Sequence, residues 1–178
     1  DESEYSFFVS RNFWVSMIAR IIEPGCQVDS VMVLEGSEGL GKTNALRAIA
    51  GKWYVSLKRS GSHNISNDFF MSLQGKLIAE ISELDAFRGT ESTLIKQVIT
   101  DKVDSFRRPY ARTVEDHPRM SVFVGTTNEK SYLKDNFGKR RWWPIYCRKI
   151  NIDYISQHRD QLFAEALSIY KSGIGWHE

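Results

Sequence analysis

The chain has 178 residues, of which 42% are hydrophobic and 26% charged, as in a soluble globular domain and unlike a fragment that needs cross-links to fold. The formal net charge of +2 is too small to indicate a class of partner. No apolar run approaches the ~20 residues of a membrane span, the N-terminus (DESE) does not resemble a signal peptide, and Cys26 and Cys147 match no metal-binding spacing. We therefore expect a protein of a reducing cytoplasm without membrane contact.

The N-terminal region is predicted to be helical. Residues 11–22 (RNFWVSMIARII) space their apolar side chains along one helical face, and the sequence EPG that follows ends the pattern. We expect residues 1–27 to form a helical segment and residues 28–178 to form the main domain. The chain begins without Met, as a piece cut from a larger protein would, and we interpret the first segment either as the remnant of a collar or oligomerisation segment or as an N-terminal buttress for the sheet.

Beyond this segment, predicted strands and helices alternate along the chain. The predicted strands are residues 30–36, 53–57, 76–81, 120–128 and 141–147, and the predicted helices are residues 42–51, 66–75, 90–100 and 153–173. This alternation predicts an α/β fold with a mainly parallel central sheet.

The sequence GSEGLGKT (residues 36–43) matches the phosphate-binding pattern G-x-x-x-x-G-K-[ST] between a predicted strand and a predicted helix, as the P-loop motif requires. Glycines allow successive backbone N–H groups to turn toward a phosphate, and the helix N-terminus adds partial positive charge. Lys42 is expected to reach the β- and γ-phosphates of a nucleotide, and the Thr43 hydroxyl to bind Mg²⁺. The predicted phosphate-binding residues are Gly36, Ser37, Glu38, Gly39, Leu40, Gly41, Lys42, Thr43 and Asn44.

The P-loop alone does not distinguish GTPases, nucleoside kinases and motor ATPases. A guanine-specific site requires an Asn-Lys-x-Asp element after a strand, and the nearest candidate, TTNEKS, lacks the aspartate. This argues against a GTPase, whereas a small-molecule kinase stays open.

Acidic residues lie at the end of the third predicted strand, in the sequence KLIAEISELDAF. Acids in this position hold the Mg²⁺ ligand shell and polarise the attacking water. Glu80 and Glu83 would lie on opposite faces of an ideal strand, so both can serve only if the strand ends between them. We predict that Glu80 contacts the metal and Glu83 the water, with the reverse assignment open, and that Asp85 is a solvated loop residue.

Two further elements complete a candidate site. Asn128 ends the strand MSVFVGTTN, where a polar side chain can position the attacking water against the γ-phosphate, although Asn is also common in ordinary turns. Arg140 and Arg141 are adjacent in GKRRWWPI, and both cannot be buried at low cost without anionic partners. One of them could stabilise transition-state charge across a subunit boundary, and the alternative is a solvated basic turn.

The ordered set GSEGLGKT, KLIAEISELDAF, VDSFRRPYAR, PRMSVFVGTTNEKSYLKD and GKRRWWPI resembles the virulence-associated protein E family, P-loop ATPases of phages and pathogenicity islands that are related to superfamily-three helicases. The resemblance extends from about residue 28 to about residue 172. Its most specific parts are EISELD and the block TTN…YLKD…GKRRWWP, whereas the P-loop is shared by many families.

The resemblance implies an ASCE-type P-loop NTPase, a three-layer sandwich that assembles as a homo-oligomeric ring, with six subunits as a candidate size, in the bacterial host cytoplasm. It also implies a hairpin within residues 103–119 that contacts DNA through Arg107, Arg108 and Arg112, with Lys102 as a weaker candidate. Such contacts need only positive charge directed into a groove. Tyr110 would either stack on a base or hold the hairpin. The alternative is a charged surface loop, compensated by nearby acids: Asp101, Asp104, Glu115 and Asp116.

The predicted function is therefore ATP hydrolysis that drives translocation on, or unwinding of, DNA during replication of a mobile element, with single-stranded DNA as partner and ATP and Mg²⁺ as cofactors. One alternative is an ATP-dependent switch or loader that recruits a replication initiator without unwinding. A less favoured alternative is a small-molecule kinase. Any primase domain would lie outside this chain.

Overall fold

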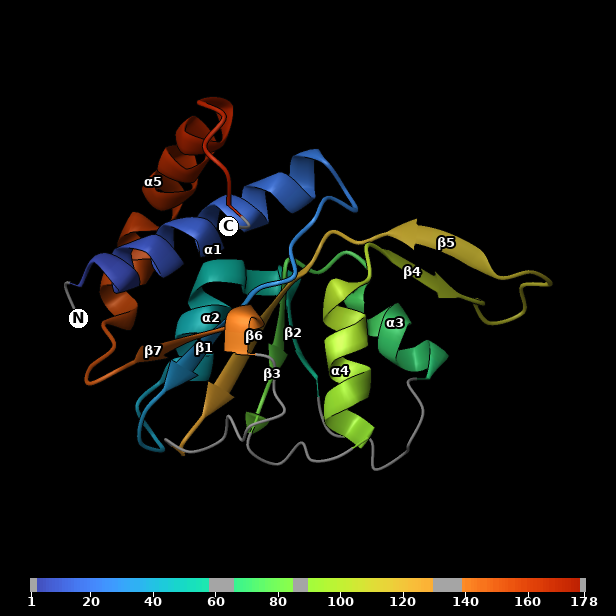
Figure 1. Cartoon of the computed structure of the whole chain (residues 1–178), viewed down its shortest axis with the longest axis horizontal. Helices are drawn as coiled ribbons and strands as arrows, with labels where there is room; N and C mark the ends of the chain where they lie inside the picture. The colour runs from blue at the N-terminus through green and yellow to red at the C-terminus, as the bar shows by residue number, and fades with distance from the viewer. Residues whose placement is uncertain (1–2, 58–65, 85–89, 130–138, 177–178) are drawn as a thin grey trace.

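The computed structural model describes residues 3–57, 66–84, 90–129 and 139–176 (Figure 1). In chain order the elements are α1 (Glu4–Ile22), β1 (Val31–Glu35), α2 (Lys42–Ala50), η1 (Gly51–Trp53), β2 (Tyr54–Leu57), α3 (Asn67–Leu73), β3 (Ile78–Ile81), α4 (Thr90–Thr100), β4 (Val103–Phe106), β5 (Glu115–Pro118), β6 (Val122–Thr127), η3 (Lys139–Arg141), β7 (Trp142–Tyr146) and α5 (Ile152–Lys171). No helix in the described ranges is both long and apolar enough to cross a membrane.

Five strands form one sheet in the order β2-β3-β6-β1-β7, and every neighbouring pair is parallel. The predicted α/β fold with a mainly parallel sheet is therefore confirmed. Since the carboxyl ends of parallel strands meet at one edge, the segments that follow β1, β3 and β6 lie together. The edge strand β7 contains Pro144, which an edge position tolerates because one side of the strand needs no ladder hydrogen bond.

Helices cover both faces of the sheet (Figure 1). On one face, α3 and α4 pack on a core that includes Val33, Ile81 and Trp142. On the other face, α1, α2 and α5 pack on a core that includes Leu34 and Val124. Alternate residues of each buried strand thus face opposite helical layers, as the two-residue period of a strand requires.

Helix α1 begins seven residues before the predicted start. Ser3 caps it, because its hydroxyl accepts a hydrogen bond from the backbone N–H of Ser6 (3.1 Å). The first turns have little apolar periodicity, and Phe7 is 70% exposed, so the sequence pattern does not indicate them. Further along, Phe13 and Met17 pack into the core beside α2. The division of the chain at residue 27 stays a prediction.

Strands β4 and β5 form an antiparallel hairpin outside the main sheet, within the segment where the family resemblance implied one (Figure 1). At its base, the Arg119 guanidinium donates to Asp104 and to the backbone carbonyl of Val98, and both charged side chains are 1% exposed. The carbonyl of Arg119 in turn accepts from Arg20 of α1 (3.2 Å). Burial lowers the pKa of Arg20 to about 10, which leaves it cationic near neutral pH. A buried polar cluster therefore fixes the base of the hairpin to the domain.

Candidate functional site

The loop between β1 and α2 approaches its neighbours too closely for a side chain at Gly36. A Cβ atom there would lie 2.7 Å from the carbonyl oxygen of Cys147 and 2.9 Å from Leu40 Cδ2. Gly41, the N-cap of α2, has a φ of 89°, a conformation that strains other residues. Burial raises the pKa of the Cys147 thiol, so this neighbour of the loop is uncharged near neutral pH. The two glycines are thus required by the backbone geometry of the loop.

Lys42 is directed back into this loop. Its Nζ donates to the carbonyls of Gly36 (2.6 Å) and Ser37 (3.0 Å) and to Oδ1 of Asn128 (2.9 Å), and the side chain is 8% exposed. Asn128 follows β6, the neighbour of β1 in the sheet. Two of the residues predicted to belong to one site are therefore in direct contact, although they lie far apart in the sequence.

Glu80 is fully buried on the sheet face that α2 covers. Its Oε1 accepts hydrogen bonds from the hydroxyls of Thr43 and Thr126, both at 2.7 Å. Thr43 lies in the first turn of α2 and Thr126 lies in β6, so three segments meet at one carboxylate. Thr43 and Glu80, which were each predicted to bind Mg²⁺, are therefore in direct contact.

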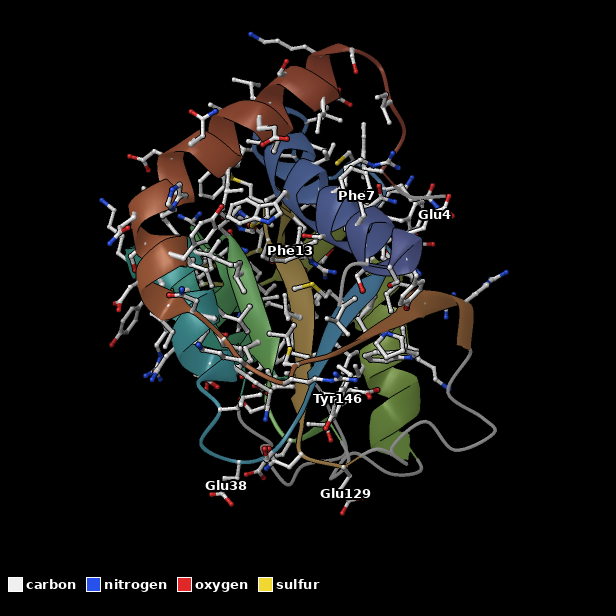
Figure 2. All side chains as sticks on the ribbon, turned by 90° about the vertical axis from the view of Figure 1, so that its left-hand side faces the viewer. Glu4, Phe7, Phe13, Glu38, Glu129 and Tyr146 are labelled. Carbon is white, nitrogen blue, oxygen red and sulfur yellow. The ribbon has the colours of Figure 1, made fainter. Side chains whose placement is uncertain are left out.

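Glu83 lies in the segment that follows β3 and lines the pocket beside the loop. Strand β3 ends at Ile81, between the two glutamates, which is the condition under which both could serve. Glu83 has a φ of 53°, so the chain turns sharply after the strand, and its side chain is exposed. With the loop between β1 and α2 it lines a pocket of about 330 Å³, formed by Glu38, Gly39, Leu40, Gly41, Lys42, Thr43, Asn44, Ser82, Glu83, Thr126, Thr127 and Asn128. Figure 2 shows Glu38 of the loop and Glu129 after β6 at this same end of the molecule.

Tyr54, at the start of β2, is a site residue that the sequence analysis missed. Its hydroxyl donates to Oε2 of Glu80, the oxygen that the two threonines leave free. Burial and, secondly, this hydrogen bond raise the pKa of Tyr54 to about 12, so the hydroxyl is a donor at neutral pH. Only the pairing of β2 with β3, which places Ser56 opposite Glu80, brings Tyr54 near the acid. No local motif indicates this register.

Arg140 and Arg141 are not brought to this pocket. They precede β7, whose first residue pairs with Val31 at the start of β1, whereas the glycine-rich loop of the pocket follows the end of β1. The start and the end of β1 are four residues apart in the strand, or roughly 13 Å. Arg140 is exposed, and the buried Nε of Arg141 has no hydrogen-bond partner in the part of the chain that the structure describes. Neither arginine is therefore placed at the pocket of its own chain.

The side chains at the pocket suit a phosphate ester and a hard divalent cation. Gly36, Gly39 and Gly41 present backbone without a side chain at three positions of the loop, and Lys42 supplies a positive charge. Thr43 and Glu80 supply only oxygen donors, the ligands that Mg²⁺ prefers. The residues present therefore fit a magnesium–nucleotide complex, with Thr43 and Glu80 on the metal side.

A model of the virulence-associated protein E-like domain matches residues 1–178, which is the whole chain. The chain belongs to this family. A comparison with curated proteins finds no match.

Solved structures resemble this virulence-associated protein E-like domain in fold. The A form apo structure of the NrS-1 C-terminal region matches with a TM-score of 0.57 and 17% identity, covering 98% of this chain and 46% of the other. A second A form apo structure, of NrS-1 residues 305–718, gives 0.52 and 17%, with coverage of 96% and 44%. The chain thus spans less than half of the solved chains it matches.

The hairpin of this virulence-associated protein E-like domain carries the arginines that were predicted to contact DNA. Arg107, Arg108 and Arg112 lie between β4 and β5, and all three are exposed. Arg108 pairs with Glu115 at 3.5 Å, so one arginine has a partial counter-charge. Tyr110 has a φ of 65° and is fully exposed, so it does not hold the hairpin by packing. Asp104, expected among the compensating surface acids, is instead buried against Arg119.

Proposed function

We propose that this chain is the ATP-hydrolysing domain of a mobile-element replication protein, with the P-loop NTPase fold, and that it acts on single-stranded DNA as a homo-oligomeric ring. The strongest support is the contact of Thr43 with the buried Glu80, beside the contact of Lys42 with Asn128. These hydrogen bonds join β1–α2, β3 and β6 at the carboxyl edge of a parallel sheet, where α/β proteins bind ligands.

Each residue has a role in this proposal. The backbone N–H groups of residues 36–43 bind the phosphates, and Lys42 exchanges the carbonyls of Gly36 and Ser37 for phosphate oxygens. Thr43 and Glu80 hold Mg²⁺, which when bound neutralises phosphate charge. Glu83, exposed in the pocket, accepts a proton from the attacking water, and Asn128 orients that water. When Lys42 binds phosphate, its hydrogen bond to Asn128 breaks. Asn128 is then free to orient the attacking water.

DNA-stimulated ATP hydrolysis tests this function. Phosphate release is measured with and without single-stranded DNA, alongside light scattering with and without nucleotide. Stimulation by DNA together with nucleotide-dependent assembly supports the motor. A protein that binds nucleotide but neither hydrolyses it nor responds to DNA would contradict the motor hypothesis. That result would indicate the switch or loader. Phosphate transfer to a nucleoside or sugar would indicate a kinase.

We expect Arg141→Ala to lower hydrolysis by the assembled protein about 1,000-fold or more, because an arginine that acts on transition-state charge from a neighbouring subunit contributes on that scale. Nucleotide affinity should be unchanged, since Arg141 lies near the start of β1, whereas the P-loop of the same chain follows the end of β1. Phosphate release and equilibrium binding of a fluorescent ATP analogue measure the two effects. Arg140→Ala tests the adjacent arginine in parallel.

A mixing experiment separates a role in trans from a local defect. The Arg141→Ala variant keeps an intact P-loop, and the Lys42→Ala variant keeps an intact Arg141. In a mixed ring, some interfaces therefore place the P-loop of one variant against Arg141 of the other. We expect the mixture to recover part of the hydrolysis that each variant lacks alone. A mixture as inactive as its components would rule out the trans-acting arginine.

We expect the triple variant Arg107→Ala, Arg108→Ala, Arg112→Ala to bind single-stranded DNA at least about tenfold more weakly at low salt. The slope of log affinity against log salt concentration should fall by about 2, because up to three phosphate contacts of ~0.7 each are lost. Fluorescence anisotropy over a salt series measures both. The control removes three exposed lysines outside the hairpin: Lys52, Lys149 and Lys171. Equal losses in both variants would argue against a specific role for the hairpin.

A further inference from the structure

The hydrogen bonds to Glu80 divide unequally between its two oxygens. Thr43 and Thr126 both donate to Oε1. Among the residues that the structure describes, Tyr54 is the one that donates to Oε2. Within the described ranges, no cationic side chain forms an ion pair with Glu80, although the residue is 0% exposed. Hydroxyl groups therefore compensate for the burial of this acid, and one of them determines which way Oε2 points.

Helix α2 holds Tyr54 as well as Glu80. Thr43, in its first turn, contacts the acid directly, and Arg47, four residues later on the same helix face, lies over the Tyr54 ring at 5.2 Å. The ring is thus fixed between β2, which carries it, and α2, which covers it. Because Ser56 pairs with Glu80, Tyr54 is two residues away on the same face of the neighbouring strand, within reach of the carboxylate.

We propose that Tyr54 is a positioning residue for Glu80: its hydroxyl holds Oε2 away from the pocket, so that Oε1 stays against the Thr43 hydroxyl and the magnesium site is preformed. The role rests on the proposed ATPase function. Without the Tyr54 hydroxyl, the carboxylate can rotate about its terminal bond, and Thr43 loses its fixed acceptor. Phosphate binding by the loop does not depend on this contact, so the defect is specific to the metal.

Tyr54→Phe tests this role, since it keeps the ring under Arg47 and removes one oxygen. Binding of a fluorescent ATP analogue is measured first in EDTA and then during titration with Mg²⁺. We expect the affinity in EDTA to stay within about twofold of wild type, while the Mg²⁺ concentration for half-maximal tightening rises about tenfold, as for loss of a hydrogen bond to a charged group. Thermal unfolding of the same samples reports stability.

Tyr170→Phe is the matched control. The Tyr170 hydroxyl also donates to a glutamate, Glu23, but outside the pocket. We expect its Mg²⁺ titration to equal that of wild type. A Tyr54→Phe titration equal to wild type, or a loss of affinity that is the same in EDTA and in Mg²⁺, would overturn the positioning role and leave the ATPase proposal intact. A wild-type protein whose nucleotide affinity does not respond to Mg²⁺ would overturn both.

Discussion

We expect Lys42→Ala to lower ATP hydrolysis at least about 100-fold and to leave the fold intact, because among the described residues no other cationic side chain lines the pocket to stabilise phosphate charge. The acceptors of its Nζ are carbonyls of a loop that borders the pocket, where water can replace the amine. Phosphate release measures turnover, and circular dichroism during thermal unfolding measures stability.

Lys76→Ala provides a control for loss of a lysine. The Lys76 Nζ also donates to a backbone carbonyl, that of Lys52 at 3.0 Å, but outside the pocket. Its hydrolysis rate should match wild type. Wild-type turnover by the Lys42 variant would remove the P-loop from the mechanism.

The buried ion pair at the base of the hairpin should have the largest effect on stability. We expect Asp104→Ala to lower the free energy of unfolding by roughly 3–5 kcal/mol, because Arg119 would remain buried without its anionic partner. Urea unfolding followed by tryptophan fluorescence measures the loss. Ser105→Ala, on the same strand, removes only an exposed hydrogen bond to Asp116 and should cost less than about 1 kcal/mol.

The double variant Asp104→Leu, Arg119→Met replaces both charges with apolar groups of similar size. We expect it to regain most of the stability lost in Asp104→Ala, since replacing a whole buried pair costs less than breaking it. Recovery should be incomplete, because the Val98 carbonyl loses its donor. A double variant as unstable as the single one would show that the ion pair itself, and not the unpaired charge, determines stability.

The parts of the site that could be predicted from the sequence are local in the chain. Glycine, lysine and threonine spacing within eight residues indicates a loop between a strand and a helix. Glu80 lies near the end of an apolar strand and Asn128 lies at the end of another, and both strands are evident from composition. The meeting of these segments then follows from the parallel sheet, because strand ends gather at one edge. The role of each residue in hydrolysis stays a prediction.

The features that could not be predicted depend on non-local register or burial. Tyr54 reaches Glu80 only through the alignment of β2 with β3. Asp104 and Arg119 are 15 residues apart, and in the sequence they are indistinguishable from the exposed charges around them. The start of α1 at Glu4 depends on a serine cap and on packing beyond it, since the first turns lack an apolar stripe. In each case tertiary contacts determine the observed structure, and the local residue pattern does not indicate it.

Strand β6 joins two distant parts of the molecule. Arg119, just before it, belongs to the buried cluster at the hairpin, and Thr126 and Asn128 at its other end contact Glu80 and Lys42. All six of its residues are buried between neighbouring strands, over about 17 Å. Under the proposed function, binding of nucleotide and binding of DNA are then thermodynamically linked. If bound nucleotide changes the affinity for DNA at the hairpin by some factor, bound DNA must change the affinity for nucleotide at the pocket by the same factor.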